Sequence, residues 1–249
     1  MSTHSFFITG TDTDVGKTII TCGLMAAFKQ AGYSVLGHKP ISAGCATVIT
    51  QGQASLRNED AVAMQALASL DIPYEQVNPI AFTPAIAPHI AAEQAQQSID
   101  TTLLDENLTT LQTHNADVLM VEGAGGWLLP ISQTQTLAPW VAQHKLPVIM
   151  VVAMRLGCLN HALLTAQAIS ASGCEIVGWV ANSFSEQPFA EANITTLTTM
   201  LQAPLLGVVP RIDMGEDAAL TAPETTQKQA EHVAEHLDIS LLSLGENVT

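Results

Sequence analysis

The sequence predicts an α/β fold in which a mostly parallel central sheet lies between two layers of helices. Short runs rich in Val, Ile and Phe alternate with longer Ala- and Leu-rich stretches of helical period. The apolar runs lack polar alternation, as expected of strands that helices cover on both faces. A length of 249 residues suits one large α/β domain, and no linker or repeat divides it. We therefore expect a single domain over 1–249.

Six strands and six helices are expected in alternation. The strands are predicted at 5–9, 34–38, 118–121, 148–152, 176–180 and 205–208. The helices are predicted at 17–31, 58–69, 101–114, 136–144, 160–172 and 189–200, with Gly32 and Gly173 at two C-caps. Between 71 and 88, repeated X-Pro pairs break both patterns and predict a long surface excursion. The acidic segment from 224 onwards predicts one more amphipathic helix.

Composition limits the classes of partner. The chain has 47% hydrophobic residues and a formal net charge of -15, because 23 acidic residues face only 8 Lys and Arg. This balance disfavours binding to nucleic acid or to an anionic membrane. No signal-peptide pattern and no apolar window long enough for a membrane span is found, which indicates a cytoplasmic protein. The widely spaced cysteines form no CxxC pair and predict buried free thiols: Cys22, Cys45, Cys158 and Cys174.

The segment 10–18, GTDTDVGKT, is the strongest local signal. It follows the first predicted strand and precedes the first predicted helix, which is the context of a phosphate-binding loop, or P-loop. In such a loop, backbone N–H groups hold phosphates, a lysine reaches the outer ones and a hydroxyl binds Mg²⁺. Lys17 and Thr18 occupy these two positions, although Thr11 stands where the strict pattern has its first glycine. The alternative is a turn with a solvated lysine, which the strand and helix on either side disfavour.

Lys39 follows the second predicted strand and precedes Pro40. In a parallel sheet it would emerge at the same carboxyl edge as the P-loop and add a second cation beside the phosphates. The alternative is an ordinary surface lysine.

Two acidic residues are candidate magnesium ligands. Glu122 ends an apolar run and is followed by Gly123, Ala124, Gly125 and Gly126, so backbone can approach a ligand closely there. On this segment alone, a glutamate that opens a glycine-rich turn is an equal alternative. Asp60 is a weaker candidate, because acidic residues in a first helical turn commonly complement the helix dipole.

Together these motifs resemble the dethiobiotin synthetase family in order and spacing, over roughly residues 5–212. The matching segments are the loop at 10–18, Lys39-Pro40, Arg57-Asn58-x-Asp60, Glu122-Gly123-Ala124-Gly125-Gly126, Leu156-Gly157-Cys158-x-Asn160-His161 and Trp179-Val180-Ala181-Asn182. The set is more specific than any one motif, since other P-loop proteins share single motifs. Beyond Ile212 the resemblance fades.

The resemblance implies a P-loop NTPase fold and a homodimeric ligase of biotin biosynthesis. Such an enzyme joins CO₂ to 7,8-diaminononanoate and closes a ureido ring with ATP, through a carbamate and a carbamic-phosphoric mixed anhydride, and releases ADP and phosphate. It implies Mg²⁺ as cofactor, ATP as co-substrate, and neither nucleic acid nor membrane as partner.

The resemblance also implies roles for individual residues. Thr18, Asp60 and Glu122 correspond to the magnesium set. Lys17 and Lys39 correspond to the pair beside the transferred phosphate, and Thr13 to a residue that faces the carbamate. The implied nucleotide site comprises Asp14, Val15, Gly16, Lys17, Thr18, Ile19, Asp60, Glu122, Gly123, Ala124, Gly125, Asn182, Pro210, Arg211 and Ile212. The implied substrate residues are Thr13, Lys39, Ser42 and Asn160, the last acting across the dimer interface.

One position departs from the family pattern. The family commonly reads K-P-x-x-S-G with a serine that touches substrate, whereas this chain has Ala43 at that serine and Ser42 before it. The contact is therefore lost or shifted to Ser42.

Three other classes of P-loop protein are considered as alternatives. Partition and septum-positioning ATPases carry an extra lysine early in the loop, where this chain has Asp12, and they need a basic face or an amphipathic tail. Cobalamin-type amidases usually bring a glutamine-hydrolysing domain, for which 249 residues leave no room. Nucleotide kinases normally add an Arg-rich lid, and this chain has few Arg.

Overall fold

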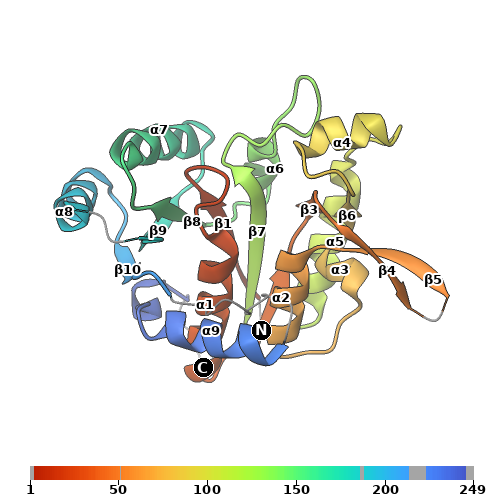
Figure 1. The fold of residues 1–249 in the computed structure, drawn as a ribbon, viewed down its shortest axis with the longest axis horizontal. Helices are drawn as coiled ribbons and strands as arrows, with labels where there is room; N and C mark the ends of the chain where they lie inside the picture. Colours follow the sequence, from red (N-terminus) through yellow and green to blue (C-terminus); the bar gives the residue numbers. More distant parts are fainter. Residues whose placement is uncertain (1–2, 51, 186–187, 213–222, 245–249) are drawn as a thin grey trace.

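The central sheet of the computed structural model has six parallel strands in the order β10-β9-β8-β1-β7-β2 (Figure 1). The structure describes residues 3–50, 52–185, 188–212 and 223–244. The strands are β1 His4–Gly10, β2 Val35–His38, β7 Val118–Gly126, β8 Val148–Ala153, β9 Ile176–Asn182 and β10 Leu205–Val209. Each corresponds to a predicted strand, and the prediction of a mostly parallel α/β sheet is confirmed.

Helices cover both faces of this sheet and make three layers. Their bounds are α1 Lys17–Gln30, α2 Glu59–Leu67, α3 Tyr74–Val77, α4 Pro88–Gln94, α5 Thr101–Thr113, α6 Ala138–Gln143, α7 Cys158–Ala171, α8 Ala190–Met200 and α9 Pro223–Ala234, with a 3₁₀ turn at Ile239–Leu241. One apolar core packs α1, α2 and α9 against one face of the sheet. The other core packs helices α5, α6, α7 and α8 against the opposite face. The predicted C-cap positions Gly32 and Gly173 have φ of 91° and 78°, a backbone that glycine adopts without strain.

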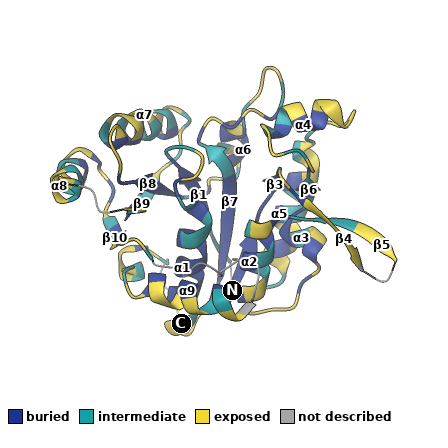
Figure 2. Ribbon diagram, viewed as in Figure 1, coloured by how far each residue is buried: buried dark blue, intermediate teal, exposed yellow. Residues whose placement is uncertain are grey.

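The two cores follow from the two-residue period of the strands. In β1, Phe6 and Ile8 belong to the core under α1, whereas Phe7 belongs to the core under α5 and α6. Because both faces are covered, strand residues of either parity are buried, and Figure 2 shows the central strands as the most continuously buried part of the molecule. This explains the absence of polar alternation in the sequence.

The prediction of a surface excursion between 71 and 88 is wrong. This segment contains α3 and the short strand β6 (Ile80–Ala81), which pairs in parallel with β3 (Ile41–Ser42). Five of its apolar side chains are buried in the core under α5, namely Ile72, Tyr74, Val77, Ile80 and Phe82. The X-Pro pairs do prevent a long helix, but short elements between them still pack inward.

Other differences concern strand ends and additions. β7 continues to Gly126, so Glu122 lies within the strand and is fully buried, not at its tip. An antiparallel hairpin, β4 Ala46–Thr50 and β5 Gln53–Arg57, was not predicted and extends away from the sheet (Figure 1). The cysteines of the described chain are free thiols, three of them buried. Within the ranges described, no helix is long and apolar enough to cross a bilayer.

Candidate active site

The P-loop connects the carboxyl end of β1 to α1, so the N-terminus of α1 faces the loop. Gly16 stands at the N-cap with φ of 83°, and a Cβ there would collide with the Asn182 side chain. Asn182 Nδ2 donates to Val15 O over 2.9 Å, which fastens the loop to the end of β9. Glycine is therefore required both by the left-handed backbone and by the close approach of β9.

Two side chains hold the outer part of the loop. Lys17 Nζ donates to Asp12 O over 3.2 Å, so the loop backbone curls around the ammonium group. Burial lowers the pKa of Lys17, and Glu122 partly opposes this effect. Arg155, just after β8, pairs with Asp12 through an Nη2–Oδ2 distance of 2.6 Å. Arg155 was missed in the sequence, where only its place after an apolar strand could have pointed to it.

Lys39 lies between two carboxylates instead of on the surface. Its Nζ is 2.6 Å from Glu122 Oε1 and 2.8 Å from Asp60 Oδ2, and the side chain is 4% exposed. Burial disfavours the charge of Lys39, but Glu122 and Asp60 outweigh burial and raise its pKa. Burial likewise disfavours the charge of Asp60, and Lys39 reverses the effect so that the pKa of Asp60 is lowered. Lys39 is thus paired with both carboxylates at the edge of the sheet where the P-loop lies.

Glu122 also receives two hydroxyl groups from α1. Thr18 Oγ1 donates to Glu122 Oε1 over 3.1 Å, and Thr21 Oγ1 lies 2.6 Å from Glu122 Oε2. Thr21 is fully buried and was missed in the sequence. Two features of the sequence could have pointed to Thr21: it is a polar residue in a largely apolar helix, and it lies three residues after Thr18, on the same helical face.

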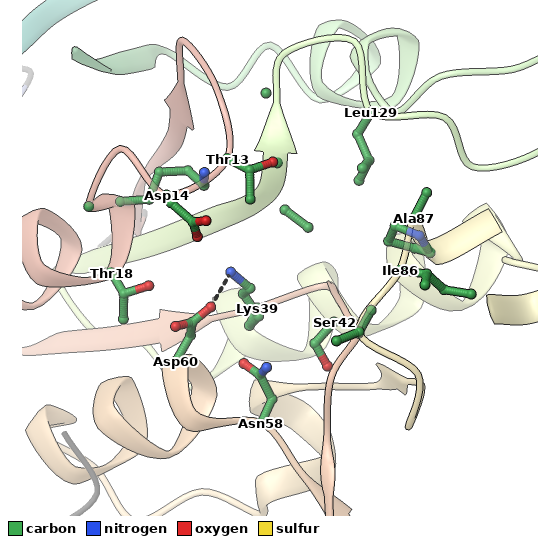
Figure 3. Close-up of a pocket in the computed structure, with 18 of the residues that line it drawn as sticks. Thr13, Asp14, Thr18, Lys39, Ser42, Asn58, Asp60, Ile86, Ala87 and Leu129 are labelled. Carbon is green, nitrogen blue, oxygen red and sulfur yellow. Dashed lines mark hydrogen bonds and ion pairs between the residues drawn. The ribbon is translucent and has the colours of Figure 1, made fainter. Parts of the chain in front are cut away.

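Lys17, Thr18, Lys39 and Asp60 line a cavity of about 950 Å³. The P-loop residues Asp14 and Thr18 face Lys39 and Asp60 across it, as Figure 3 shows, with the ion pair between Lys39 and Asp60 drawn as a dashed line. The far wall is mainly apolar and consists of Ala85, Ile86, Ala87, Pro88, Leu128, Leu129 and Pro130. The cavity therefore joins a phosphate-binding end to a wall suited to a hydrocarbon chain.

The structure brings several other predicted residues to this cavity. Its lining includes Thr13, Gly16, Ile19, Ser42, Ala43, Ala124 and Gly125. Ser42 is buried, and its hydroxyl lies 2.8 Å from Asn78 Oδ1. Ser42 therefore faces the cavity while its hydroxyl is hydrogen-bonded to Asn78.

Several predicted residues lie outside the cavity lining. Val15 and Glu122 are buried beneath it, Gly123 follows Glu122 in β7, and Asn182 reaches only the loop backbone. Asn160 is exposed in the first turn of α7, away from the cavity of its own chain. The stretch 210–212, Pro210, Arg211 and Ile212, follows β10 without lining the cavity.

Comparison with known proteins identifies the family. A family model described as an AAA domain matches residues 4–218. The chain is 49% identical to an ATP-dependent dethiobiotin synthetase of Cellvibrio japonicus (strain Ueda107), over 89% of this chain and 96% of that protein. The chain therefore belongs to the dethiobiotin synthetase family.

Two more relatives of this family show how far the similarity extends. A dethiobiotin synthetase of Yersinia pestis bv. Antiqua (strain Angola) is 45% identical over 98% of this chain and 97% of that protein. Its counterpart in Escherichia coli (strain K12) is 44% identical over 87% and 94%. The match spans the P-loop, the Lys39 cluster and β9 alike.

Solved structures agree on the fold. A ParA family ATPase from Chlorobium tepidum TLS superposes with a TM-score of 0.59 and 15% identity, covering 98% of this chain and 99% of that chain. The MinD cell division protein of Aquifex aeolicus gives a TM-score of 0.53 and 13% identity, covering 93% and 95%. At such identities the likeness shows a P-loop NTPase fold shared with the dethiobiotin synthetase family, and no more.

Proposed function

We propose that this chain is an ATP-dependent dethiobiotin synthetase, a ligase that carboxylates 7,8-diaminononanoate with CO₂ and closes the ureido ring. The observation that carries the proposal is one cavity that combines a P-loop, the Lys39, Asp60 and Glu122 cluster, and an apolar wall. A phosphate-binding loop alone would suit any NTPase. The apolar wall beside the second lysine suits a substrate with a long hydrocarbon chain, which receives the phosphoryl group in place of water.

Phosphoryl transfer asks a protein mainly for positioning and for stabilisation of charge on the phosphoryl oxygens. Backbone N–H groups of the P-loop and the N-terminus of α1 would bind the phosphates of ATP. Lys17 would contact the outer phosphates, and Lys39 would approach the transferred group from the opposite side. The carbamate oxygen of the substrate, facing Thr13, would then attack the γ-phosphate and release ADP.

The donor set also fits a magnesium ion. Thr18, Asp60 and Glu122 present only oxygen ligands, and Glu122 Oε1 lies 3.1 Å from Thr18 Oγ1. Mg²⁺ commonly takes one or two protein carboxylates and completes its shell with phosphate and water, and this set offers two carboxylates and one hydroxyl. When bound, Mg²⁺ would neutralise charge on the phosphoryl oxygens. Lys39 would have to exchange part of its contact with the two carboxylates for a phosphoryl oxygen.

Ring closure needs no nucleophilic side chain. The mixed anhydride holds an activated carbonyl, and the second amine of the same molecule attacks it and displaces phosphate. The cavity wall would keep the hydrocarbon chain still, which makes the step effectively intramolecular. The remaining site assignments, the adenine pocket at Asn182 and 210–212 and the substrate contact of Ser42, belong to the same proposal.

The active unit is proposed to be a homodimer in the cytoplasm, built on one domain. Asn160 supports the dimer, because it is exposed near an N-terminus that could receive a substrate carboxylate from a neighbouring subunit. Sedimentation at assay concentration tests this point: a dimer is expected, and a fully active monomer would contradict it.

The function is tested by ADP release with and without 7,8-diaminononanoate and bicarbonate. Release should depend on the diamine, because the phosphoryl acceptor is its carbamate. Equal turnover without diamine would favour a switch ATPase of the kind that shares this fold.

A further inference from the structure

The segment 74–82 holds the backbone around Lys39 and Ser42. Lys39 N–H donates to Val77 O over 2.7 Å, and Phe82 N–H donates to Ser42 O over 3.0 Å. Both cavity residues therefore depend on hydrogen bonds to a segment without any role in the reaction so far.

Asn78 is the centre of these contacts and is 4% exposed. Its Nδ2 donates to Lys39 O over 2.7 Å and to Ile80 O over 3.3 Å. Its Oδ1 accepts from Ser42 Oγ over 2.8 Å and from the Tyr74 hydroxyl over 3.2 Å. Both amide hydrogens and both oxygen lone pairs are used, so the amide has one orientation that satisfies all partners.

Tyr74 extends this network to α2. Its hydroxyl accepts from Asn58 N–H over 2.7 Å, and Asn58 is the N-cap of the helix that carries Asp60. Burial raises the pKa of Tyr74, so the phenol keeps the proton that it donates to Asn78. The Tyr74 ring lies 4.0 Å from the Arg57 guanidinium carbon, which holds the ring in place. One buried chain of hydrogen bonds thus joins Asn58 to Asn78.

We propose that Asn78 and Tyr74 are positioning residues for the phosphoryl-transfer and substrate groups. They hold the backbone of Lys39, the hydroxyl of Ser42 and the start of α2 in fixed relation, and neither is among the residues that line the cavity. This inference rests on the proposed function and adds to it a determinant of substrate geometry. The network reaches three cavity elements at once, so its loss would misplace groups that must meet on one substrate.

Two substitutions of different severity test the network. Tyr74→Phe removes only the hydroxyl and keeps the ring beside Arg57. Asn78→Asp keeps the side-chain shape but turns two donors into acceptors that oppose the carbonyls of Lys39 and Ile80. Since misplacing reacting groups by about 1 Å can cost about 100-fold, we expect kcat/KM for the diamine to fall ~10-fold in Tyr74→Phe and ~100-fold in Asn78→Asp.

Measuring the affinity for ATP should distinguish a positioning role of Tyr74 and Asn78 from a general loss of structure in the variants. Among the described residues no hydrogen bond joins the P-loop to Asn58, Tyr74 or Asn78, so calorimetric Kd for ATP should change less than about three-fold. Tyr33→Phe is the matched control, since Tyr33 is 37% exposed and packs edge-to-face on Phe28. It should leave both quantities unchanged.

A readout without turnover completes the test. The Asn58 amide should exchange its hydrogen faster in Tyr74→Phe, because it loses its acceptor, while amides of α1 keep their protection. Near-normal kcat/KM in Tyr74→Phe together with unchanged Asn58 exchange would overturn the inference, as would equal losses of ATP affinity and turnover. If Asn78→Asp does not fold, Tyr74→Phe decides. A wild-type protein without diamine-dependent ADP release would remove the proposed function and this inference with it.

Discussion

The two sides of the cavity differ in how the chain builds them. The P-loop side, which we propose binds phosphate and call the phosphate side, is built from consecutive residues. The opposite side, which we propose binds the diamine and call the substrate side, is assembled from segments far apart in the chain. Residues 13–19 form one loop and the first turn of α1, and neighbouring backbone sets their geometry. Lys39 and Ser42 come from one segment, whereas 85–88 and 128–130 come from two others, and a contact such as Asn78 Nδ2 to Lys39 O spans 39 positions.

This difference has a consequence for mutation. A substitution on the phosphate side is expected to remove a proposed phosphate contact directly. A substitution on the substrate side acts through neighbours, because each cavity group there is held by a residue from another segment. Lys39 lies where the two sides meet, since it contacts Glu122 and Asp60 beside the P-loop and its backbone N–H is bonded to α3.

The largest effect is expected on the phosphate side. Lys17→Gln should weaken ATP binding and lower turnover together, because we propose that the ammonium contacts the nucleotide in both the ground state and the transition state. Loss of one preorganised charged donor costs roughly 100- to 1000-fold, so kcat/KM for ATP should fall by at least that much. Steady-state kinetics and calorimetry measure the two parts. Lys228→Gln, in an exposed position of α9, is the matched control and should behave as wild type.

At the boundary between the two sides, Lys39→Gln should separate rate from binding. If Lys39 stabilises charge that develops during transfer, kcat should fall by about 100-fold or more while ATP affinity changes far less. The same assays apply. Equal losses of ATP affinity and of kcat would mean that Lys39 contributes to ground-state ATP binding only. Near-normal turnover would mean that Lys39 is only a structural partner of Glu122.

The metal carboxylates should give a smaller and more specific effect. Asp60→Asn or Glu122→Gln should raise the Mg²⁺ concentration for half-maximal activity by about 10-fold or more, because an oxygen ligand loses its charge. Glu59→Gln is the matched control, since Glu59 is exposed in the same first turn of α2 and its loss has the same effect on the helix dipole. Unchanged magnesium titrations in both variants would mean that Asp60 and Glu122 have only a structural role.

The smallest effect is expected at Arg155. Its side chain and that of Asp12 are each about half exposed, at 47% and 46%, and such ion pairs contribute little. Arg155→Gln should therefore lower kcat/KM for ATP by no more than about five-fold, with the difference from wild type shrinking at high salt. A 100-fold loss would mean that Arg155 contacts the phosphates during the reaction.

Sequence predicted the phosphate side well because its determinants are local. Gly16, Lys17 and Thr18 lie at the junction of β1 and α1, and the strand and helix on either side predicted a P-loop although Thr11 replaces the first glycine of the strict pattern. The apolar runs predicted the strands, since a strand covered on both faces must be apolar throughout. Lys39 was chosen by its place at a strand end and Asp60 mainly through the family resemblance, and the structure brings their side chains to within 2.8 Å.

The substrate side was less predictable because periodicity does not reveal which short elements pack inward. The X-Pro pairs of 71–88 excluded a long helix, yet they gave no sign that Tyr74 and Asn78 would be buried beside Lys39. The glycines after Glu122 suggested a turn, whereas parallel pairing of Gly126 with Gly10 extends the strand. The role of Thr21 could not be recognised from the sequence because its hydrogen-bond partner, Glu122, lies 101 positions away.

The central claim is that both sides of the cavity act on one substrate, so that the phosphoryl acceptor is the carbamate. Oxygen transfer tests it most directly. With C¹⁸O₂, diamine and ATP, in a reaction shorter than exchange of CO₂ with water, mass spectrometry should find one ¹⁸O in each phosphate released. That oxygen bridges carbon and phosphorus in the mixed anhydride and leaves with phosphate when the ring closes. Phosphate without ¹⁸O from CO₂, and with one oxygen from labelled water instead, would show that water is the acceptor and would contradict the account.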